Sequence, residues 1–449
     1  MGQKIDRTYL FERMPVGQAV RRQIIPSIAS QMVILLYNLA DTYFVGLLND
    51  ASQTAAVSLA YSVTLLMTAL ANLFAVGGAG RIAQLLGRRD RDGAGEVCAV
   101  SFWFALLASA AFCVLFTLLS SPILRLCGAT DETYALACGY SRWVISVGGT
   151  FSILNTVLAN LIRADGSAFA ASMGVSAGGI INMLLDPLFV LPRFLGMGAE
   201  GAGLATAISN AAGMLILLGI IAARRRVGVV ALRPGDLRAA RRHIGRILRI
   251  GLPSAVQFLL TLVAVGALTK FMSLYDTAAV AALGIVKKLD MLPLYFSIGV
   301  ANGLLPLLAY NYSAENHERR HRIFLCGCAV AVGFSVVCVA GYEVFAPALV
   351  RIFIGDAQTI AYGTKLLRIM VLAMPMMSVC YPMITQFQAM GRMRESLICS
   401  ILRKGSLDIP LLFVLNALFP LYGCAAVQPI VDCICMIVAI YFYKKLPTA

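Results

Sequence analysis

Runs of about twenty apolar residues recur along the whole of this 449-residue chain. A helix of that length crosses the roughly 30 Å hydrocarbon core of a bilayer and satisfies its own backbone hydrogen bonds. Only 13% of the residues are charged and the mean hydropathy is +0.82, whereas soluble domains are about one quarter charged. A β-barrel would instead show alternating segments about ten residues long. The sequence therefore predicts an all-α integral membrane protein.

Twelve apolar runs are long enough to count as transmembrane helices. They lie near residues 24–48, 54–86, 97–120, 134–162, 168–191, 201–223, 250–274, 277–311, 323–347, 361–390, 396–418 and 422–443. Between the sixth and seventh runs, residues 224–249 hold nine arginines and no long apolar stretch. We therefore expect an N-terminal six-helix lobe (1–223), a cytoplasmic basic linker (224–249) and a C-terminal six-helix lobe (250–449).

Positive charge sets the expected orientation, because loops rich in arginine and lysine stay in the cytoplasm. With the N-terminus inside, most cationic loop residues fall on the inner side, including Arg88, Arg89, Arg91, Arg319, Arg320, Arg322, Arg392, Arg394, Lys444 and Lys445. Both termini are thus expected in the cytoplasm of a cell with the chain in its inner or plasma membrane. The net charge of +15 is spread over these loops and forms no basic domain, so no nucleic-acid partner is expected. We also expect a monomer without a cofactor.

The two halves of the chain resemble each other. "TAAVSLA" (54–60) matches "TAAVAAL" (277–283), "IPS" (25–27) matches "LPS" (252–254), and "GAGLATAI" (201–208) loosely matches "GCAAVQPI" (423–430). The offsets are all near 225 residues, so six-helix repeats of the same orientation are expected, related by a pseudo-twofold axis. Two such bundles around a central site are a plan typical of secondary transporters.

Two carboxylates interrupt the apolar runs of the first half, where a charge is costly and usually marks function. Asp41 follows Arg22 by 19 residues and Asp186 follows Asp165 by 21, which places both about 30 Å from the cytoplasmic side. Asn182 lies one turn before Asp186, and Thr206 lies at a similar depth on the next helix. These oxygens are suited to hold Na⁺, or to share a proton between the two acids.

The second half has its own charges within apolar runs. Lys287 and Asp290, and likewise Lys404 and Asp408, have the spacing to neutralise each other along one helix face. Lys288, Asp290 and Asp408 are candidates for a gate or a substrate-lining set, with a static ion-pair core as the alternative.

Two prolines, Pro26 and Pro253, are expected to open the first and seventh helices. There a missing backbone hydrogen bond allows a bend, or else proline simply occupies the first turn.

Several segments in order resemble the multidrug and toxic compound extrusion (MATE) transporters over nearly the full length. They are "NLADTYFVG", "NTVLANLIRADGS", "INMLLDPLFV", "GAEGAGLATAIS" and "LPLLAYNYSAENHERR". The branch most similar is that of DNA-damage-inducible protein F. The resemblance implies a cation-coupled antiporter that expels organic cations and amphipathic compounds.

The resemblance also implies roles for single residues. Asp41 is similar to the coupling carboxylate on helix one, with Tyr37 a turn earlier and Pro26 at a bend. Asn182, Asp186 and Thr206 are similar to its polar partners, and Tyr140 and Asn155 to further members of the network. Branches that couple through the second half carry a glutamate on helix seven. Here that helix offers Gln257 and Thr261, which favours coupling by H⁺ or Na⁺ in the first half.

Two other functions stay open at this point. A lipid-linked-precursor flippase of the same superfamily predicts helices beyond twelve and a cationic central cavity. A membrane-embedded enzyme such as a transferase predicts a polar loop with clustered histidines and acids. The three histidines, His243, His317 and His321, all lie in basic segments instead.

Overall fold

The computed structural model describes residues 8–48, 50–225 and 228–446, and within these residues the regular elements are all helices. The all-α prediction is therefore confirmed. A short π-helix, η1 (Tyr9–Arg13), precedes the first long helix. The first half then forms α1 (Val16–Gly46), α2 (Ala51–Gly87), α3 (Arg91–Leu126), α4 (Asp131–Ser141), η2 (Arg142–Val147), α5 (Gly149–Ala164), α6 (Ala168–Val190) and α7 (Ala199–Ala223).

The second half begins with a 3₁₀ turn, η3 (Pro234–Ala239), within the arginine-rich segment, of which residues 226–227 lie outside the description. Its elements are α8 (Ala240–Met272), α9 (Thr277–Ser313), α10 (His317–Arg351), α11 (Ala357–Val371), α12 (Ala373–Ala389), α13 (Met393–Ile401), η4 (Leu402–Ser406), α14 (Asp408–Leu418) and α15 (Tyr422–Lys444).

Three of the twelve predicted spans are broken helices. Within the described residues nine helices can cross a membrane unaided, and two bent pairs, Asp131–Val147 with Gly149–Ala164 and Ala357–Val371 with Ala373–Ala389, raise this to eleven. The bends are 45° and 42°. The remaining predicted span, residues 396–418, is made of α13, η4 and α14, and Lys404 has non-helical backbone angles there.

The two prolines expected to open helices lie inside them, so that prediction is wrong. α1 begins at Val16, ten residues before Pro26, and α8 begins at Ala240, thirteen before Pro253. Arginines lie among the early residues of both helices, Arg21 and Arg22 in α1 and Arg241 and Arg242 in α8, so these residues do not belong to an apolar run. Each proline therefore removes one hydrogen bond from the interior of its helix. In the first turn it would have removed none, because the N–H groups there have no partner within the helix.

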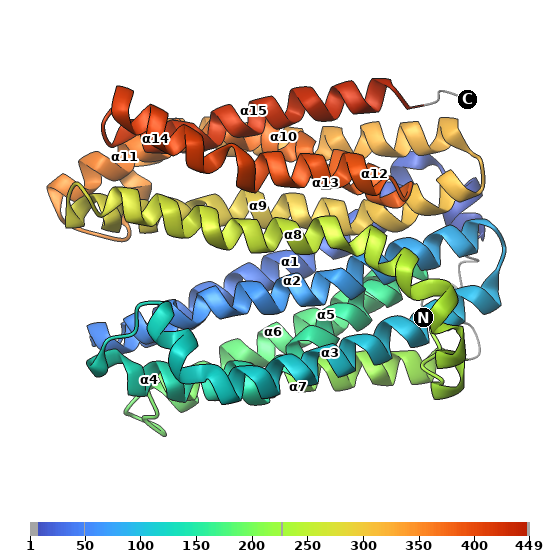
Figure 1. Cartoon of the computed structure of the whole chain (residues 1–449), viewed down its shortest axis with the longest axis horizontal. Coiled ribbons are helices and arrows are strands. Elements are labelled where there is room, and N and C mark those ends of the chain that lie inside the picture. Colours follow the sequence, from blue (N-terminus) through green and yellow to red (C-terminus); the bar gives the residue numbers. More distant parts are fainter. Residues whose placement is uncertain (1–7, 49, 226–227, 447–449) are drawn as a thin grey trace.

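The helices form two elongated bundles that lie alongside each other (Figure 1). Elements α1 to α7 make the first lobe and α8 to α15 the second. We call the right-hand end in Figure 1 the basal end, where α1 begins and α2, α9 and α15 end, and the opposite end the distal end. Both described chain ends lie at the basal end, together with the arginine-rich loops after α2 and before α10.

The lobes meet tightly in their basal halves along two helix crossings, α2 with α8 and α1 with α9. At Gly251 an added Cβ would overlap the carbonyl oxygen of Leu73 on α2, and at Gly303 it would lie 2.8 Å from Cα of Ile24 on α1. Only glycine lets the helix backbones approach so closely.

Hydrogen bonds between the lobes, within the described chain, also lie at the basal end. They join Gln84 to the carbonyl of Ala389 (2.8 Å), His243 to Glu96 (2.8 Å), Tyr310 to Glu12 (2.8 Å) and Asn311 to the carbonyl of Phe11 (3.3 Å). Arg319 of α10 donates to the carbonyl oxygens of Phe11 (2.7 Å) and Met14 (2.6 Å), which fastens η1 to the second lobe. The lobes are thus closed against each other at this end.

Candidate functional site

Asp41 lies near the distal end of α1, five residues before the helix ends, and its side chain is buried in the first lobe. Its Oδ2 atom accepts a hydrogen bond of 3.4 Å from the hydroxyl of Tyr140 on α4. Tyr37, one turn earlier on α1, packs against α6, because a Cβ at Gly179 would lie 3.1 Å from its ring. The structure therefore brings Asp41, Tyr37 and Tyr140 together.

Asp186 is fully buried near the distal end of α6, at the same level of the lobe. The amide nitrogen of Asn182 lies 3.4 Å from Asp186 Oδ1 and 3.3 Å from the hydroxyl of Thr206 on α7. The two carboxyl groups lie close enough for their charges to interact. Three helices, α1, α6 and α7, thus place Asp41, Asp186, Asn182 and Thr206 in one polar cluster.

The acceptor atoms of this cluster outnumber its donors. Four of its buried oxygens have no hydrogen-bond donor within the described part of the chain: Asp41 Oδ1, Asn155 Oδ1, Asn182 Oδ1 and Asp186 Oδ2. Buried polar atoms in proteins are nearly always satisfied, so unpaired oxygens call for an explanation. Hard cations prefer carboxylate and amide oxygens, and a proton on one carboxyl would supply a missing donor. Both ions fit these residues.

A further amide, Asn210 of α7, belongs to the cluster and was missed in the sequence. It accepts a 3.4 Å hydrogen bond from Asn155 on α5 and donates to the Thr206 carbonyl at 2.9 Å. The signal that could have found it is its position one turn after Thr206 in an apolar helix. Pro26 lies apart, fifteen residues or about 22 Å from Asp41 along α1, so any effect it has on the cluster passes through the helix.

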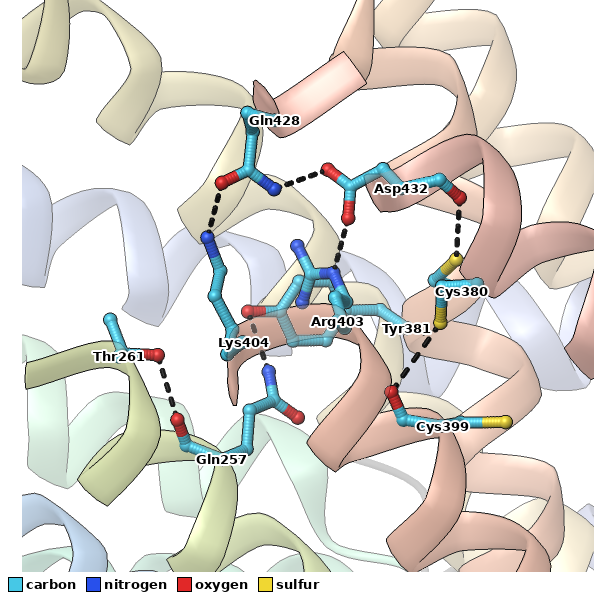
Figure 2. Close-up of polar contacts among 10 residues, drawn as sticks. Gln257, Thr261, Cys380, Tyr381, Cys399, Arg403, Lys404, Gln428 and Asp432 are labelled. Carbon is cyan, nitrogen blue, oxygen red and sulfur yellow. Dashed lines mark hydrogen bonds and ion pairs between the residues drawn. The ribbon is translucent and has the colours of Figure 1, made fainter. Parts of the chain in front are cut away.

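The second lobe holds a different kind of polar centre (Figure 2). Arg403 of η4 and Asp432 of α15 form a 2.9 Å ion pair whose side chains are 1% and 0% exposed. Gln428 donates to the other oxygen of Asp432 at 2.8 Å and accepts from the Lys404 ammonium at 2.6 Å. The Arg403 guanidinium also lies 4.3 Å from the ring centre of Tyr381. The charges of Arg403 and Asp432 are thus paired, although Arg403 Nη1 has no hydrogen-bond partner among the described residues.

The pairings predicted within single helices are wrong. In the described chain neither Lys287 with Asp290 nor Lys404 with Asp408 forms an ion pair. Lys404 has backbone angles of −136° and 18°, so the helix turns out of register before Asp408 and its ammonium reaches α15 instead.

The three candidate gate residues of this lobe differ in burial. Lys288 and Asp290 are half-buried on α9, and Asp408 is buried at the start of α14 with its Oδ2 unpaired. Their role as a gate or substrate lining stays a prediction.

Two helical lobes closed at one end, with a buried polar cluster in one of them, are an arrangement typical of membrane transporters. The MatE family model matches residues 26–188 and again 253–414, so the chain belongs to the MatE family and is a multi-pass membrane transporter rather than an enzyme. The two matches begin 227 residues apart, which confirms the internal repeat. The finer resemblance to DNA-damage-inducible protein F stays a prediction.

Characterised relatives extend over almost the whole chain. The multidrug export protein MepA of Staphylococcus aureus (strain NCTC 8325 / PS 47) is 29% identical over 437 residues, which cover 97% of this chain and 95% of MepA. MepA of Staphylococcus saprophyticus is 27% identical with the same coverage.

Solved structures agree with this assignment. The outward-facing conformation of a multidrug resistance MATE family transporter is 25% identical, has a TM-score of 0.91 and covers 98% of both chains. A superfamily transporter from Pyrococcus furiosus, described as having a binding pocket of reverse polarity, has the same TM-score and identity over 99% of this chain and 98% of its own.

Proposed function

We propose that this protein is a cation-coupled antiporter that exports organic cations and amphipathic drugs from the cell. MepA, a multidrug export protein, matches nearly the full length of the chain, which supports drugs as the substrate class. The coupling ion is a proton, with Na⁺ as the other candidate, and it binds in the first lobe at Asp41 and Asp186. The supporting residues are Asn182, Thr206, Tyr37, Tyr140 and Asn155.

The observation that carries this proposal is the excess of acceptors in the first-lobe cluster. Two carboxyl groups from α1 and α6 are buried together, and each keeps one oxygen without a donor. Two negative charges in a low-dielectric interior repel each other, so the cluster favours the uptake of a cation. A positively charged drug competes for the same negative potential, and each ligand therefore lowers the affinity of the other.

The basal end is the cytoplasmic end in this proposal, and both termini are cytoplasmic. The loops at that end carry the arginines of residues 88–91 and 319–322, as the positive-inside rule requires. The contacts between the lobes lie there, so the structure corresponds to a state closed toward the cytoplasm. Export requires these contacts to open and a drug to enter from the basal side.

The test uses purified protein in liposomes and a fluorescent organic cation. An imposed proton gradient without sodium should drive transport of that cation. Transport that depends on a sodium gradient and not on the proton gradient would make Na⁺ the coupling ion, still bound at the first-lobe cluster. Transport that ignores both gradients and depends on added ATP would reject the antiporter.

A flippase for a lipid-linked precursor is the second candidate considered in the sequence. It requires cationic groups free to receive an anionic precursor. In the second lobe Arg403 is neutralised by Asp432, and Lys404 is bound to Gln428. Lys287 and Lys288 of α9 form no ion pair within the described residues, so the charges do not decide between the two candidates. The match to MepA is what favours drug export over precursor transport.

A further inference from the structure

A cavity of about 590 Å³ lies at the basal end, where the lobes meet, far from the first-lobe cluster. It is lined from α2 by Arg81 and Leu85, from the start of α3 by Gly93 and three acids, and from α8 by Arg242, His243 and Arg246. Its volume falls in the usual range of small-molecule sites, roughly 300–1,000 Å³.

Arg81 is the unusual member of this lining. Its side chain is 4% exposed, and its Nε atom has no hydrogen-bond partner among the residues that the structure describes. A terminal nitrogen of Arg81 donates a 3.3 Å hydrogen bond to the amide oxygen of Gln84. Arg246 and Arg88 lie close enough to interact with it as like charges, and Asp90 interacts with it more weakly as an opposite charge. A buried guanidinium beside other arginines is unfavourable unless an anion joins them.

The acids that line the cavity leave the arginines available. Asp90 accepts the backbone N–H of Gly93 at 2.8 Å and caps α3, and Glu96 lies 2.8 Å from His243 Nε2. Within the described residues no ion pair joins a carboxylate to Arg81, Arg242 or Arg246. Among the described residues, Asp92 is therefore the one lining acid without a hydrogen bond or an ion pair.

The depth of the cavity indicates which anions reach it. Arg81 lies six residues before the end of α2 and Arg246 six residues after the start of α8, so both are about 9 Å inside their helix ends. Phospholipid headgroups lie at this level of a membrane protein, and basic pockets between helices on the cytoplasmic side bind them. The fork of guanidinium donors also matches the oxygens of a phosphoryl group.

We propose that this cavity binds a phosphoryl group, supplied by an anionic phospholipid headgroup, between Arg81, Arg242 and Arg246. Because the arginines come from both lobes, the bound group joins α2 to α8. It therefore stabilises the state in which the basal end is closed.

Native mass spectrometry of the full-length protein tests this inference, with phosphatidylglycerol as the lipid probe and phosphatidylcholine as the lipid of no net charge. Wild type should retain phosphatidylglycerol in preference to phosphatidylcholine. The double variant Arg242→Gln/Arg246→Gln, which changes two exposed residues and so spares the fold, should retain at least tenfold less. Arg394→Gln removes an exposed arginine elsewhere at the basal end and should retain as much as wild type.

A third arm adds inorganic phosphate as a competitor. Phosphatidylglycerol that stays bound assigns the site to the lipid, whereas displacement by phosphate supports a phosphoryl site filled by a soluble compound. Equal retention by wild type, the double variant and Arg394→Gln would overturn the proposal, as would a wild type that binds neither phosphatidylglycerol nor phosphate.

Discussion

The polar centres of the two lobes differ in how their charges are balanced. In the first lobe Asp41 and Asp186 are buried with oxygens that no donor reaches, and their partners are neutral amides and hydroxyls. In the second lobe Arg403 and Asp432 neutralise each other, and Gln428 links them to Lys404. A repeated fold therefore carries one centre that has room for an external cation and one that supplies its own.

This difference assigns different work to the two centres. An unbalanced centre changes its charge when an ion binds or leaves, so it suits coupling. A balanced ion pair at 0–1% exposure holds its geometry, and its removal is costly because one charge is left unpaired in the interior. Substitutions should therefore affect transport in the first lobe and stability in the second.

The largest expected effect is on transport, in the first lobe. Asp41→Asn and Asp186→Asn should each reduce drug export to background while the protein stays inserted and folded, because neither amide can take up a proton. Export is measured as drug resistance in an efflux-deficient host at matched expression. The double variant should be no worse than either single variant, since the two groups act as one unit.

Asp131→Asn is the matched control, because this acid lies in an exposed pair with Arg125 at the distal end. It should export as wild type does. Full export by Asp41→Asn or by Asp186→Asn would remove that residue from the mechanism.

The second expected effect is on stability, in the second lobe. Asp432→Asn leaves the buried Arg403 without its carboxylate and should cost about 3–5 kcal/mol of folding free energy. Thermal unfolding in detergent measures the loss. The joint replacement Arg403→Met/Asp432→Leu should recover most of it, because no charge is then left unpaired. Asp432→Asn with wild-type stability but no export would instead place the ion pair in the transport cycle.

The third expected effect concerns the contact between the lobes where α8 crosses α2. Gly251→Ala should destabilise the protein by about 1–3 kcal/mol, because its methyl group would overlap the carbonyl of Leu73. Gly266→Ala, on the same helix, meets nothing within 4 Å and should be neutral or stabilising by up to about 1 kcal/mol. Thermal unfolding in detergent compares the two variants. Equal melting temperatures would contradict the close approach of the α8 backbone at Gly251 to the α2 backbone at Leu73.

The smallest expected effect is that of the Tyr140 hydroxyl. Tyr140→Phe removes one hydrogen bond of 3.4 Å to Asp41, worth about 0.5–1.5 kcal/mol. The apparent drug affinity in liposomes should change by roughly two- to tenfold. Tyr134→Phe on the same helix is the control and should leave the affinity unchanged. An equal change in both variants would show that the Tyr140 hydroxyl does not contribute specifically to the coupling site.

The sequence predicts which residues of the first lobe lie together because each of them is a polar residue within an apolar run. Asp41 and Asp186 are acids in apolar runs, and the rise of 1.5 Å per residue places them at one depth. Asn182 and Asp186 are then adjacent on one helix face, as the structure shows at 3.4 Å. The distances between helices, and therefore the contact of Tyr140 with Asp41, depend on packing that no single run encodes.

The second-lobe pairing could not be read from spacing alone. A regular helix would place Lys404 over Asp408, but the π-helical turn η4 adds a residue per turn and rotates both side chains. Arg403 then reaches Asp432, 29 residues away on α15. The early starts of α1 and α8 were missed because arginines interrupt the apolar pattern there, at Arg21 and Arg22 in α1 and at Arg241, Arg242 and Arg246 in α8.

The attachment of η1 to the second lobe limits how far the two lobes can move apart at the basal end. Arg319 holds the backbone of Phe11 and Met14, and only Pro15 separates Met14 from Val16, where α1 of the first lobe begins. An extended residue spans at most about 3.6 Å, so the two lobes can separate at this point by only a few ångströms while Arg319 stays bound. Any wider opening at the basal end must first break the hydrogen bonds of Arg319 to the carbonyl oxygens of Phe11 and Met14.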